Sequence, residues 1–469
     1  MSVPKSPTVE KATRWSRRQM MTGTTGLFVS GILSVACGSP TGSTGSNSSD
    51  ASQASNPAPG SRKATLRVHV VKKTDVSDWI EEGLKQDIDS FKSKNPNLNV
   101  TLELHGTWTN EYFPQVIATS ASGQLGDLVW YPPRHRSHLA WGTKYGIVRD
   151  LIPIAKTAKY DFGQFYRGAN EQNTWEGKQY WLSYISEPIV PIIAYNKTKA
   201  QQLGMTLPKD DWTFDELAEW AKKGTVAGMH GYFRGDAGNN AFGSGPYLRQ
   251  WGVEPVDKAG KKATFMDNRD AFVKALTFRY NLMNTLNVSP NPKDGSINRD
   301  DLYGKEQKLL ASDIWPFRIQ LFPKNFTEFE TDFVLTPLAK KGEKRRSMLN
   351  EHVFGITTAS KFPEESFRFL SWISGKEMNV QGLVQGLKGP IARDDVWEDK
   401  RITEKWPVYK RLKPVMASIE PDYFVANFRG EEFDSASSWN RLERGEIPVL
   451  EAATEIQRLT QEVLNKEPA

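Results

Sequence analysis

One stretch of the chain decides its fold class, and it opens with Ala64-Thr-Leu-Arg-Val-His-Val-Val71, where apolar and polar residues alternate as in a β-strand. Residues 78–92 then place apolar side chains at helical spacing, and residues 98–104 alternate again. A second helical pattern at 111–122 leads into a short apolar run at 126–131. This order of strand, helix, strand, helix, strand predicts an α/β fold with a parallel sheet.

The carboxyl ends of the predicted strands are the expected place for a ligand site, because open α/β sheets bind ligands there. The loops after Val71, Leu104 and Tyr131 are therefore candidates. A second α/β region begins near Ile192, and its helix at 213–223 opens with a capping-box pattern. The C-terminal third is mostly helical in pattern, with helices predicted at 364–373, 406–416 and 449–464.

The length and charge of the chain narrow its functional class. The chain has 469 residues and a formal charge of +6, from 61 basic and 55 acidic residues. Residues 1–36 hold five of the basic residues and one acidic residue, so the remainder has 56 basic and 54 acidic residues. This near balance gives no support to nucleic-acid binding. The roughly 400 residues that follow the N-terminal region exceed the size at which one core keeps growing, so two lobes are expected.

The N-terminal region has the pattern of an export signal followed by a tether. Arg17 and Arg18 precede an apolar stretch that ends at Cys37, and twin arginines in this position are an export address. Small residues before Cys37, the only cysteine, suit a signal peptidase. We expect residues 1–36 to be a twin-arginine and lipoprotein signal with a lipid on Cys37, the alternative being plain secretion with an incidental cysteine. Residues 37–63 are rich in Ser, Gly and Pro and are predicted to be a flexible tether.

Several short stretches, taken in order, resemble the bacterial extracellular solute-binding proteins of the carbohydrate type, the maltose-binding-protein relatives of ABC importers. One of them departs from the family pattern, since Gly126 stands where the family usually has proline. The matching stretches are Phe91-Lys-Ser-Lys-Asn-Pro96, Ser122-Gly-Gln-Leu-Gly-Asp127, Gly177-Lys-Gln-Tyr180, Tyr195-Asn-Lys197, Trp212-Thr-Phe-Asp-Glu-Leu217, Gln250-Trp-Gly252, Gly355-Ile-Thr-Thr-Ala-Ser360 and the Leu442–Gly445 element.

The resemblance implies a two-lobed periplasmic-binding-protein fold of type II, with lobes of discontinuous chain joined by a hinge. Ligand would lie in the cleft, and the lobes would close on it by hinge bending. Lobe one would comprise 64–188 plus 305–358, and lobe two 192–300 plus 361–469. The chain would cross between them near Glu187-Pro188 and near Asn298-Arg299.

Candidate ligand-binding residues follow from the chemistry of a sugar, which presents an apolar C–H face and a rim of hydroxyl groups. Trp130 and Tyr131 follow the third predicted strand, and Trp108 follows the second. By resemblance, Trp315 occupies a position that relatives often use for stacking, and Glu187 lies where they often bind hydroxyl groups. The other candidates are Tyr184 near Glu187, Asn240 and Phe242 in a glycine-rich stretch, and Arg393 in a turn that borders the cleft in relatives.

Structural alternatives remain open for several of these residues. Trp130 could be a core tryptophan under the next helix, and Glu187 could be a structural hinge residue. Arg393 could stabilise a lobe or lie on the surface, and Asp127 is expected to be a structural cap.

Catalysis and metal binding find little support in the sequence, and no catalytic residue, metal or cofactor is predicted. The chain has no Gly-x-Ser-x-Gly elbow and no His-Glu-x-x-His motif. His135 and His138 could share a helix face, but no third ligand lies nearby in the sequence.

The sequence therefore predicts a non-enzymatic, lipid-anchored substrate-binding protein of an ABC importer for a sugar or oligosaccharide. It would be a monomer held outside the cytoplasm at the cell membrane, and it would deliver its ligand to the permease subunits. Three alternatives stay open: a binding protein for a polyamine, glycerol phosphate or opine, an exported carbohydrate-active enzyme, and a surface sensor or adhesin without a transporter.

Overall fold

The computed structural model describes residues 62–72, 78–131, 137–189, 192–234, 241–294, 297–422 and 436–465. All of them belong to one compact unit, Pro57–Ala469. The predicted export signal with Arg17, Arg18 and Cys37, nearly all of the predicted tether, and Asn240 lie outside the described residues. None of the helices in the described ranges is both long and apolar enough to cross a membrane.

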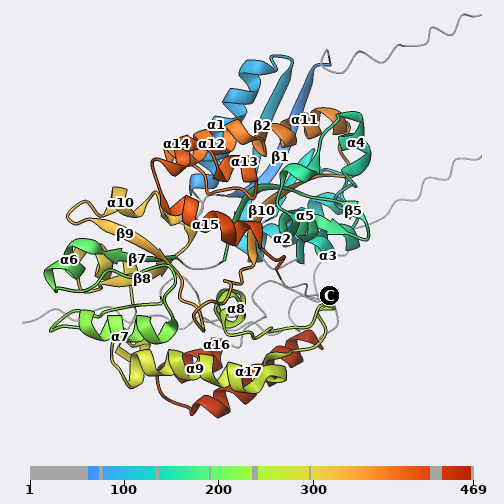
Figure 1. The fold of residues 1–469 in the computed structure, drawn as a ribbon. Coiled ribbons are helices and arrows are strands. Elements are labelled where there is room, and N and C mark those ends of the chain that lie inside the picture. Colours follow the sequence, from blue (N-terminus) through green and yellow to red (C-terminus); the bar gives the residue numbers. More distant parts are fainter. Residues whose placement is uncertain are drawn as a thin grey trace, which may run out of the picture. The chain divides into compact units, whose positions relative to one another are not determined.

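The first sheet has five strands in the order β2-β1-β3-β10-β6 (Figure 1). β1 pairs in parallel with β2 and β3, while β10 runs antiparallel to both β3 and β6. The carboxyl ends of β1, β2, β3 and β6 therefore lie at the same edge as the start of β10. The strands are β1 (Ala64–Lys72), β2 (Leu98–Thr107), β3 (Leu128–Tyr131), β6 (Leu182–Pro188) and β10 (Leu349–Ile356).

Helices from both ends of the chain cover this sheet. α1 and α11 contact each other as well as the sheet, and α2 contacts β1 and β2. The predicted strand–helix–strand order from residue 64 to residue 131 is thus confirmed. The elements of this region are α1 (Asp78–Lys94), α2 (Trp108–Ala121), α3 (Ser137–Lys144), α4 (Ile152–Thr157), η1 (Phe162–Gln164), α5 (Arg167–Asn173), β4 (Thr174–Trp175), β5 (Lys178–Gln179), α11 (Pro363–Ile373), α12 (Lys376–Gln385), α13 (Asp394–Trp397), α14 (Lys400–Thr403) and α15 (Val408–Ala417).

The second sheet has three strands in the order β8-β7-β9, and β7 is antiparallel to both neighbours. Helices α9, α16 and α17 pack on one another in the same part of the molecule (Figure 1). The elements are β7 (Ile192–Asn196), α6 (Lys197–Gln202), α7 (Phe214–Gly224), α8 (Ala241–Gln250), η2 (Phe265–Asn268), α9 (Arg269–Asn284), η3 (Pro292–Asp294), η4 (Asp301–Lys305), β8 (Ala311–Ile314), η5 (Pro316–Arg318), α10 (Phe322–Asn325), β9 (Thr331–Leu335), α16 (Ala436–Glu443) and α17 (Val449–Leu464).

Helix α7 shows how local sequence fixes an element boundary. The Glu216 N–H donates to Thr213 Oγ1, and the Thr213 N–H donates to Glu216 Oε2 at 2.7 Å. This is the predicted capping box, and it satisfies two backbone N–H groups at the start of the helix. The helix then buries Leu217, Trp220 and Ala221 on one face, as its spacing predicts.

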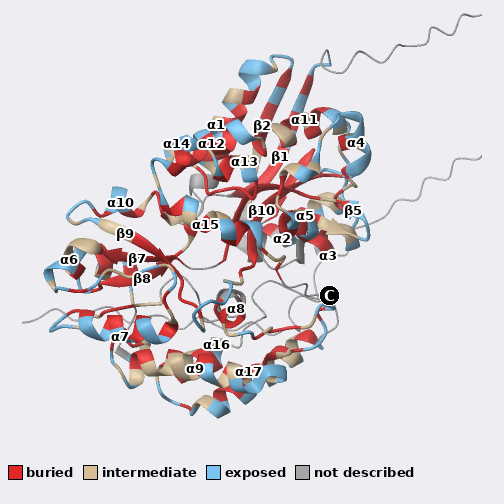
Figure 2. Cartoon of the chain, viewed as in Figure 1, coloured by how far each residue is buried: buried red, intermediate tan, exposed pale blue. Residues whose placement is uncertain are grey.

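Two hydrophobic clusters form the interior, and the strands of both sheets are largely buried (Figure 2). β7 contributes to both clusters, since Ile192 and Ala194 belong to the first while Ile193 and Tyr195 belong to the second. Successive side chains of a strand point to opposite faces. The three-stranded sheet therefore lies between the two clusters.

The distribution of strands differs from the predicted lobe boundaries. β8 and β9 fall within 305–358, which was predicted for lobe one, but they pair with β7 in the second sheet. Likewise, α11 to α15 fall within 361–469, predicted for lobe two, yet α11 packs on the first sheet and residues of α11 to α15 belong to its hydrophobic cluster. The chain does not change sheets near 298–299; it returns after β9, because the apolar residues of β8 and β9 complete the sheet around β7.

Candidate functional site

The passages of chain between the two sheets lie side by side and are hydrogen-bonded. The Ile189 N–H donates to the Met348 carbonyl at 2.7 Å, just after β6. The Leu349 N–H donates to the Glu420 carbonyl, and the Glu420 N–H donates to the Ser347 carbonyl, both at 3.1 Å. Three segments far apart in sequence thus form one ribbon where the chain passes from one sheet to the other, as a hinge requires.

Glu187 lies at this passage, at the end of β6, and only 2% of its surface is exposed. Its Oε2 accepts the Phe317 N–H at 2.8 Å, and its Oε1 accepts Asn350 Nδ2 at 3.3 Å. Asn350 is also its cross-strand partner on β10. The carboxylate therefore joins the end of β6 to η5, the short helix that follows β8.

Trp315 stands directly after β8, as the N-cap residue of η5. The next residue, Pro316, is favoured at the first position of a helix because its φ is already fixed. Trp315 is half-buried and packs against the second hydrophobic cluster. Glu187 and the Trp315 segment, both predicted by resemblance as ligand-binding positions, are thus brought together by the fold.

Trp130, by contrast, lies in the core. It is fully buried, stacks on His352 with ring centroids 5.7 Å apart, and meets the edge of Tyr112 at 5.5 Å. Tyr112 comes from α2, and its hydroxyl donates to the Trp130 carbonyl at 2.7 Å. α2 therefore covers the end of β3, and the core interpretation of Trp130 fits this structure. Tyr131 is also buried, against the edge of Trp181.

Tyr184 is fully buried beside an internal ion pair. Lys388 Nζ lies 2.7 Å from Asp87 Oδ2 and 4.3 Å from the centre of the Tyr184 ring. Burial raises the pKa of Asp87 and lowers the pKa of Lys388, while their attraction opposes both shifts. The group ties the loop after α12 to α1 and β6. Tyr184 therefore lies in a contact that holds these elements together.

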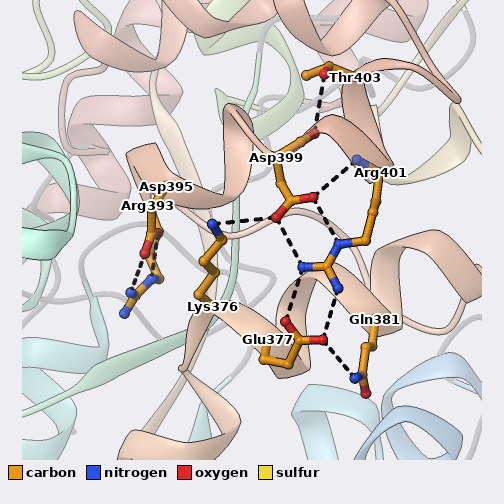
Figure 3. A network of polar contacts seen from close by, with 8 residues as sticks. All are labelled: Lys376, Glu377, Gln381, Arg393, Asp395, Asp399, Arg401 and Thr403. Carbon is orange, nitrogen blue, oxygen red and sulfur yellow. Dashed lines mark hydrogen bonds and ion pairs between the residues drawn. The ribbon is translucent and has the colours of Figure 1, made fainter.

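Arg393 stabilises its own lobe. Its guanidinium makes a two-pronged ion pair with Asp395, at 3.0 and 2.8 Å (Figure 3). It also lies 5.4 Å from the centre of the Phe165 ring. Only 6% of Arg393 is exposed. The lobe-stabilising alternative therefore describes Arg393, and the partner that the sequence reading missed is Asp395, two residues away.

For some of the remaining predicted residues the structure describes the backbone but not the side chain. Trp108 begins α2 and Phe242 lies in the first turn of α8, but their side chains are outside the described part of the structure. Asp127 has the structural role expected of it, since its carboxylate accepts the Arg67 N–H at 2.9 Å and the Ser360 hydroxyl at 2.6 Å.

A buried polar cluster next to Trp315 was missed by the sequence reading. Asp313 lies two residues before Trp315 on β8; it accepts the Tyr232 hydroxyl and lies 3.8 Å from Arg234 Nε. Arg234 in turn lies 4.1 Å from the centre of the Tyr247 ring. Burial lowers the pKa of Arg234 to about 10, so it stays charged at neutral pH.

These four residues border a cavity of about 10 Å³, enough for about one water molecule. The cluster fixes β8 against the segment that leads into the glycine-rich stretch. Only the positions of these residues along the sequence could have pointed to the cluster. Asp313 lies two residues before the matched tryptophan, and Arg234 directly precedes the glycine-rich stretch.

Comparison with models of protein families identifies the family of this chain. A model of the bacterial extracellular solute-binding protein family matches residues 73–380. The chain belongs to this family. Its members are binding proteins that work outside the cytoplasm, and the predicted relationship is thereby confirmed. A search of curated proteins finds no match.

Solved structures of this class have the same fold. An ABC substrate-binding protein from Listeria monocytogenes, in complex with cycloalternan, matches with a TM-score of 0.69 and 17% identity over 86% of this chain and all of that one. Maltose-bound MalE3 from T. maritima matches with a TM-score of 0.67 and 19% identity over 85% and 99%. The GacH receptor of Streptomyces glaucescens, solved unliganded and with acarbose, matches with a TM-score of 0.68 and 18% identity over 86% and 98%. These likenesses confirm the predicted two-lobed periplasmic-binding-protein fold.

Proposed function

We propose that this protein captures a sugar or oligosaccharide between its two lobes and delivers it to the permease subunits of an ABC importer. The observation that carries the proposal is the meeting of Glu187 and the Trp315 segment where the chain passes between the sheets. Family membership supports a binding role rather than catalysis. The sugars named for the cycloalternan, maltose and acarbose complexes support the ligand class.

The binding residues act through complementary chemistry. Trp315 offers a half-buried aromatic ring for the C–H face of a sugar ring. Glu187 is held in place by two hydrogen bonds, so hydroxyl groups near it meet a fixed acceptor. Trp108, Asn240 and Phe242 remain proposed contacts from their positions in the chain.

Closure supplies the signal to the transporter. A ligand that touches both lobes binds the closed form more tightly than the open form, and it shifts the equilibrium only by that difference. The permease subunits then recognise the closed form. We further propose that the protein is exported through Arg17 and Arg18 and held at the membrane as a monomer by a lipid on Cys37.

A thermal-shift screen over mono- and oligosaccharides tests the ligand class. A ligand that binds only the folded state adds about 2.7 kcal/mol of stability at one hundred times its Kd, so a true ligand raises Tm clearly. A shift with polyamines, glycerol phosphate or opines, and with none of the sugars, would contradict a sugar ligand. New reducing ends after incubation with an oligosaccharide would contradict a purely binding role.

A separate experiment tests the proposed lipid anchor at Cys37. In cells that express Cys37→Ser, we expect the protein to leave the membrane fraction while its ligand-induced Tm shift is unchanged. Retention of the variant in the membrane fraction would contradict lipid attachment at Cys37 without affecting the proposed ligand class.

A further inference from the structure

Four charged side chains of alternating sign form a ring beside the passages of chain between the two sheets. The members of this ion ring are Arg249, Glu254, Arg346 and Glu420. Arg249 Nε lies 2.9 Å from Glu254 Oε2, and Arg249 Nη1 lies 3.3 Å from Glu420 Oε2. Arg346 Nη2 donates to Glu254 Oε1 at 2.7 Å and to Glu420 Oε2 at 3.1 Å. Each carboxylate therefore contacts both guanidinium groups.

The ion ring joins two of the passages to the lobe built on the second sheet. Glu420 lies in one passage, and Arg346 directly precedes another. Arg249 comes from the last turn of α8, which contributes Leu248 to the second hydrophobic cluster. The side chain of Gln250, the last residue of α8, donates a further hydrogen bond to the Arg346 carbonyl. The end of α8 is thus attached to both passages.

The passage that contains Glu420 is also attached to the other lobe, by contacts that carry no charge. Gln172 lies on α5, which packs on the first sheet, and its Oε1 accepts the Asp422 N–H at 2.7 Å. The Ile419 carbonyl lies so close to Gly168 of α5 that a Cβ there would be only 2.3 Å from its oxygen. The passage is therefore held between α5 on one side and α8 on the other.

The two attachments differ in how readily they break. The hydrogen bond to α5 is buried, and a contact between uncharged groups is not screened by salt. In the ion ring only the Arg249 side chain is enclosed, whereas those of Glu254, Arg346 and Glu420 are 36%, 39% and 42% exposed. Exposed ion pairs contribute little one by one, and salt weakens them. The attachment to α8 is therefore the one that breaks more easily.

We propose that the ion ring is a salt-sensitive latch on the hinge. While the ring is intact, it holds the passage to α8 and restricts how far the two lobes turn relative to each other. When the ring opens, the passage stays attached to α5, and the lobe that carries α8 turns. The latch is a property of the chain itself and needs no ligand.

A link between this latch and ligand binding rests on the proposed function. Phe242, a proposed ligand contact, lies in the first turn of α8, and Arg249 lies in its last turn. A helix of this length moves as one rigid element, so a ligand held at its start is connected to the ion ring at its end. The affinity for an uncharged sugar should therefore depend on salt, although the sugar itself has no charge to screen.

Distance measurements between spin labels on the two lobes test the latch in the absence of ligand. In a Cys37→Ser background the chain has no other cysteine, so Lys92→Cys on α1 and Lys274→Cys on α9 place one label on each lobe. Glu420→Gln keeps the size of the side chain and removes its charge. It should raise the share of molecules outside the main distance at least about threefold at low salt. In 1 M NaCl the unmodified ring should show the same change, and Glu420→Gln should show no further one.

A matched control separates the ion ring from exposed charges in general. Glu377→Gln removes the charge of an exposed carboxylate that pairs with Arg401 on α14, and it should leave the distances unchanged. Glu254→Gln removes the other carboxylate of the ring and should act in the same direction as Glu420→Gln. Both ring variants should keep a Tm close to that of the unmodified protein, which separates loss of the latch from loss of the fold.

The proposal is overturned if Glu420→Gln and the unmodified protein give the same distances at low salt, or if Glu377→Gln changes them as much. Neither result bears on the sugar ligand, because no ligand is present. Once the Tm screen has identified a sugar, its Kd should change with salt in the unmodified protein and not in Glu420→Gln. A salt dependence that persists in Glu420→Gln would overturn the link between the latch and ligand binding.

Discussion

Two ion clusters in the same region of the molecule use the same chemistry in opposite settings. Lys388 and Asp87 form a pair whose side chains are 1% and 3% exposed. Arg401 on α14 bridges Glu377 on α12 and Asp399, the N-cap residue of α14 (Figure 3). The side chains of Arg401 and Glu377 are 47% and 53% exposed. A charge left alone in the interior has no water to solvate it, whereas an exposed one does. Burial rather than pairing therefore decides how much the loss of one partner lowers the free energy of unfolding.

The pKa directions show the same difference. In the interior, desolvation dominates and raises the pKa of the Asp87 carboxyl. In the exposed cluster, hydrogen bonds from Arg401 dominate and lower the pKa of Asp399 to about 2. The same contrast applies to aromatic residues, since Trp130 is enclosed while Trp315 is partly open.

Breaking the buried pair should have the largest effect. Lys388→Ala leaves the Asp87 carboxylate without its cation, and we expect a loss of about 3–5 kcal/mol in the free energy of unfolding. Urea unfolding followed by circular dichroism measures it. The double variant Asp87→Leu with Lys388→Met should recover most of that loss, because no charge is left unpaired. A Lys388→Ala midpoint as high as that of Arg401→Ala would refute the comparison.

The buried histidine His352 should make the protein sensitive to acid. Burial lowers its pKa from 6.5 to about 3, so the unfolded chain binds a proton between these values while the folded chain does not. Its contribution is therefore complete above pH 6.5 and is lost as the pH falls toward 3, by up to about 1.4 kcal/mol per pH unit. His352→Phe keeps an aromatic ring against Trp130 and should flatten this part of the stability profile. If the unmodified protein and His352→Phe show the same slope, the assignment of this pH dependence to His352 is wrong.

Asp399, in the Arg401 cluster, provides the counterpart in the same titration. Its pKa is lowered to about 2, so its contribution is present above its ordinary value near 3.8 and is lost as the pH falls through 2. Asp399→Asn should therefore leave the profile between pH 4 and 6.5 unchanged.

Substitutions of Trp315 and Trp130 should separate an effect on ligand affinity from an effect on stability. Trp315→Ala should lower sugar affinity at least tenfold, about 1.4 kcal/mol, with folding intact, because its ring is half-buried at the end of β8. Trp130→Phe is the control, and it should leave affinity unchanged while lowering Tm, because the ring lies in the core. Calorimetry with the sugar found by the Tm screen measures both. Unchanged affinity in Trp315→Ala would remove this residue from the site.

The smallest effect is expected at the surface cluster. Arg401→Ala should cost less than about 1 kcal/mol at physiological ionic strength, since exposed ion pairs are screened by salt. The difference from the unmodified protein should shrink further in 1 M NaCl. A loss as large as that of Lys388→Ala would mean that exposure does not govern these clusters.

Much of the fold was predictable because it rests on local patterns. Alternation marked β1 and β2, and helical spacing with a capping box marked α7 to within a residue at each end. The resemblance to the family rested on short motifs of this kind, and it was confirmed. The predicted lobe boundaries failed at β8 and β9, since local patterns identify a strand but not the sheet that it joins.

The site was predictable only where position along the chain was enough. Glu187 and Trp315 were named from positions that match the family, and the structure brings their segments together. Trp130 looked equivalent, because it also follows a strand at the ligand edge, but α2 covers it. Asp313 and Arg234 come together because the segment before Arg234 bridges to β8, a long-range pairing that one sequence does not reveal.

The sequence by itself determined the strand and helix order, the family and the near neutrality of the folded part, because each depends on neighbouring residues or on counts. Only the tertiary structure decided which strands share a sheet, which charges lose their water and which tryptophan is enclosed in the core. Those outcomes depend on what covers each side chain, and the covering element comes from elsewhere in the chain.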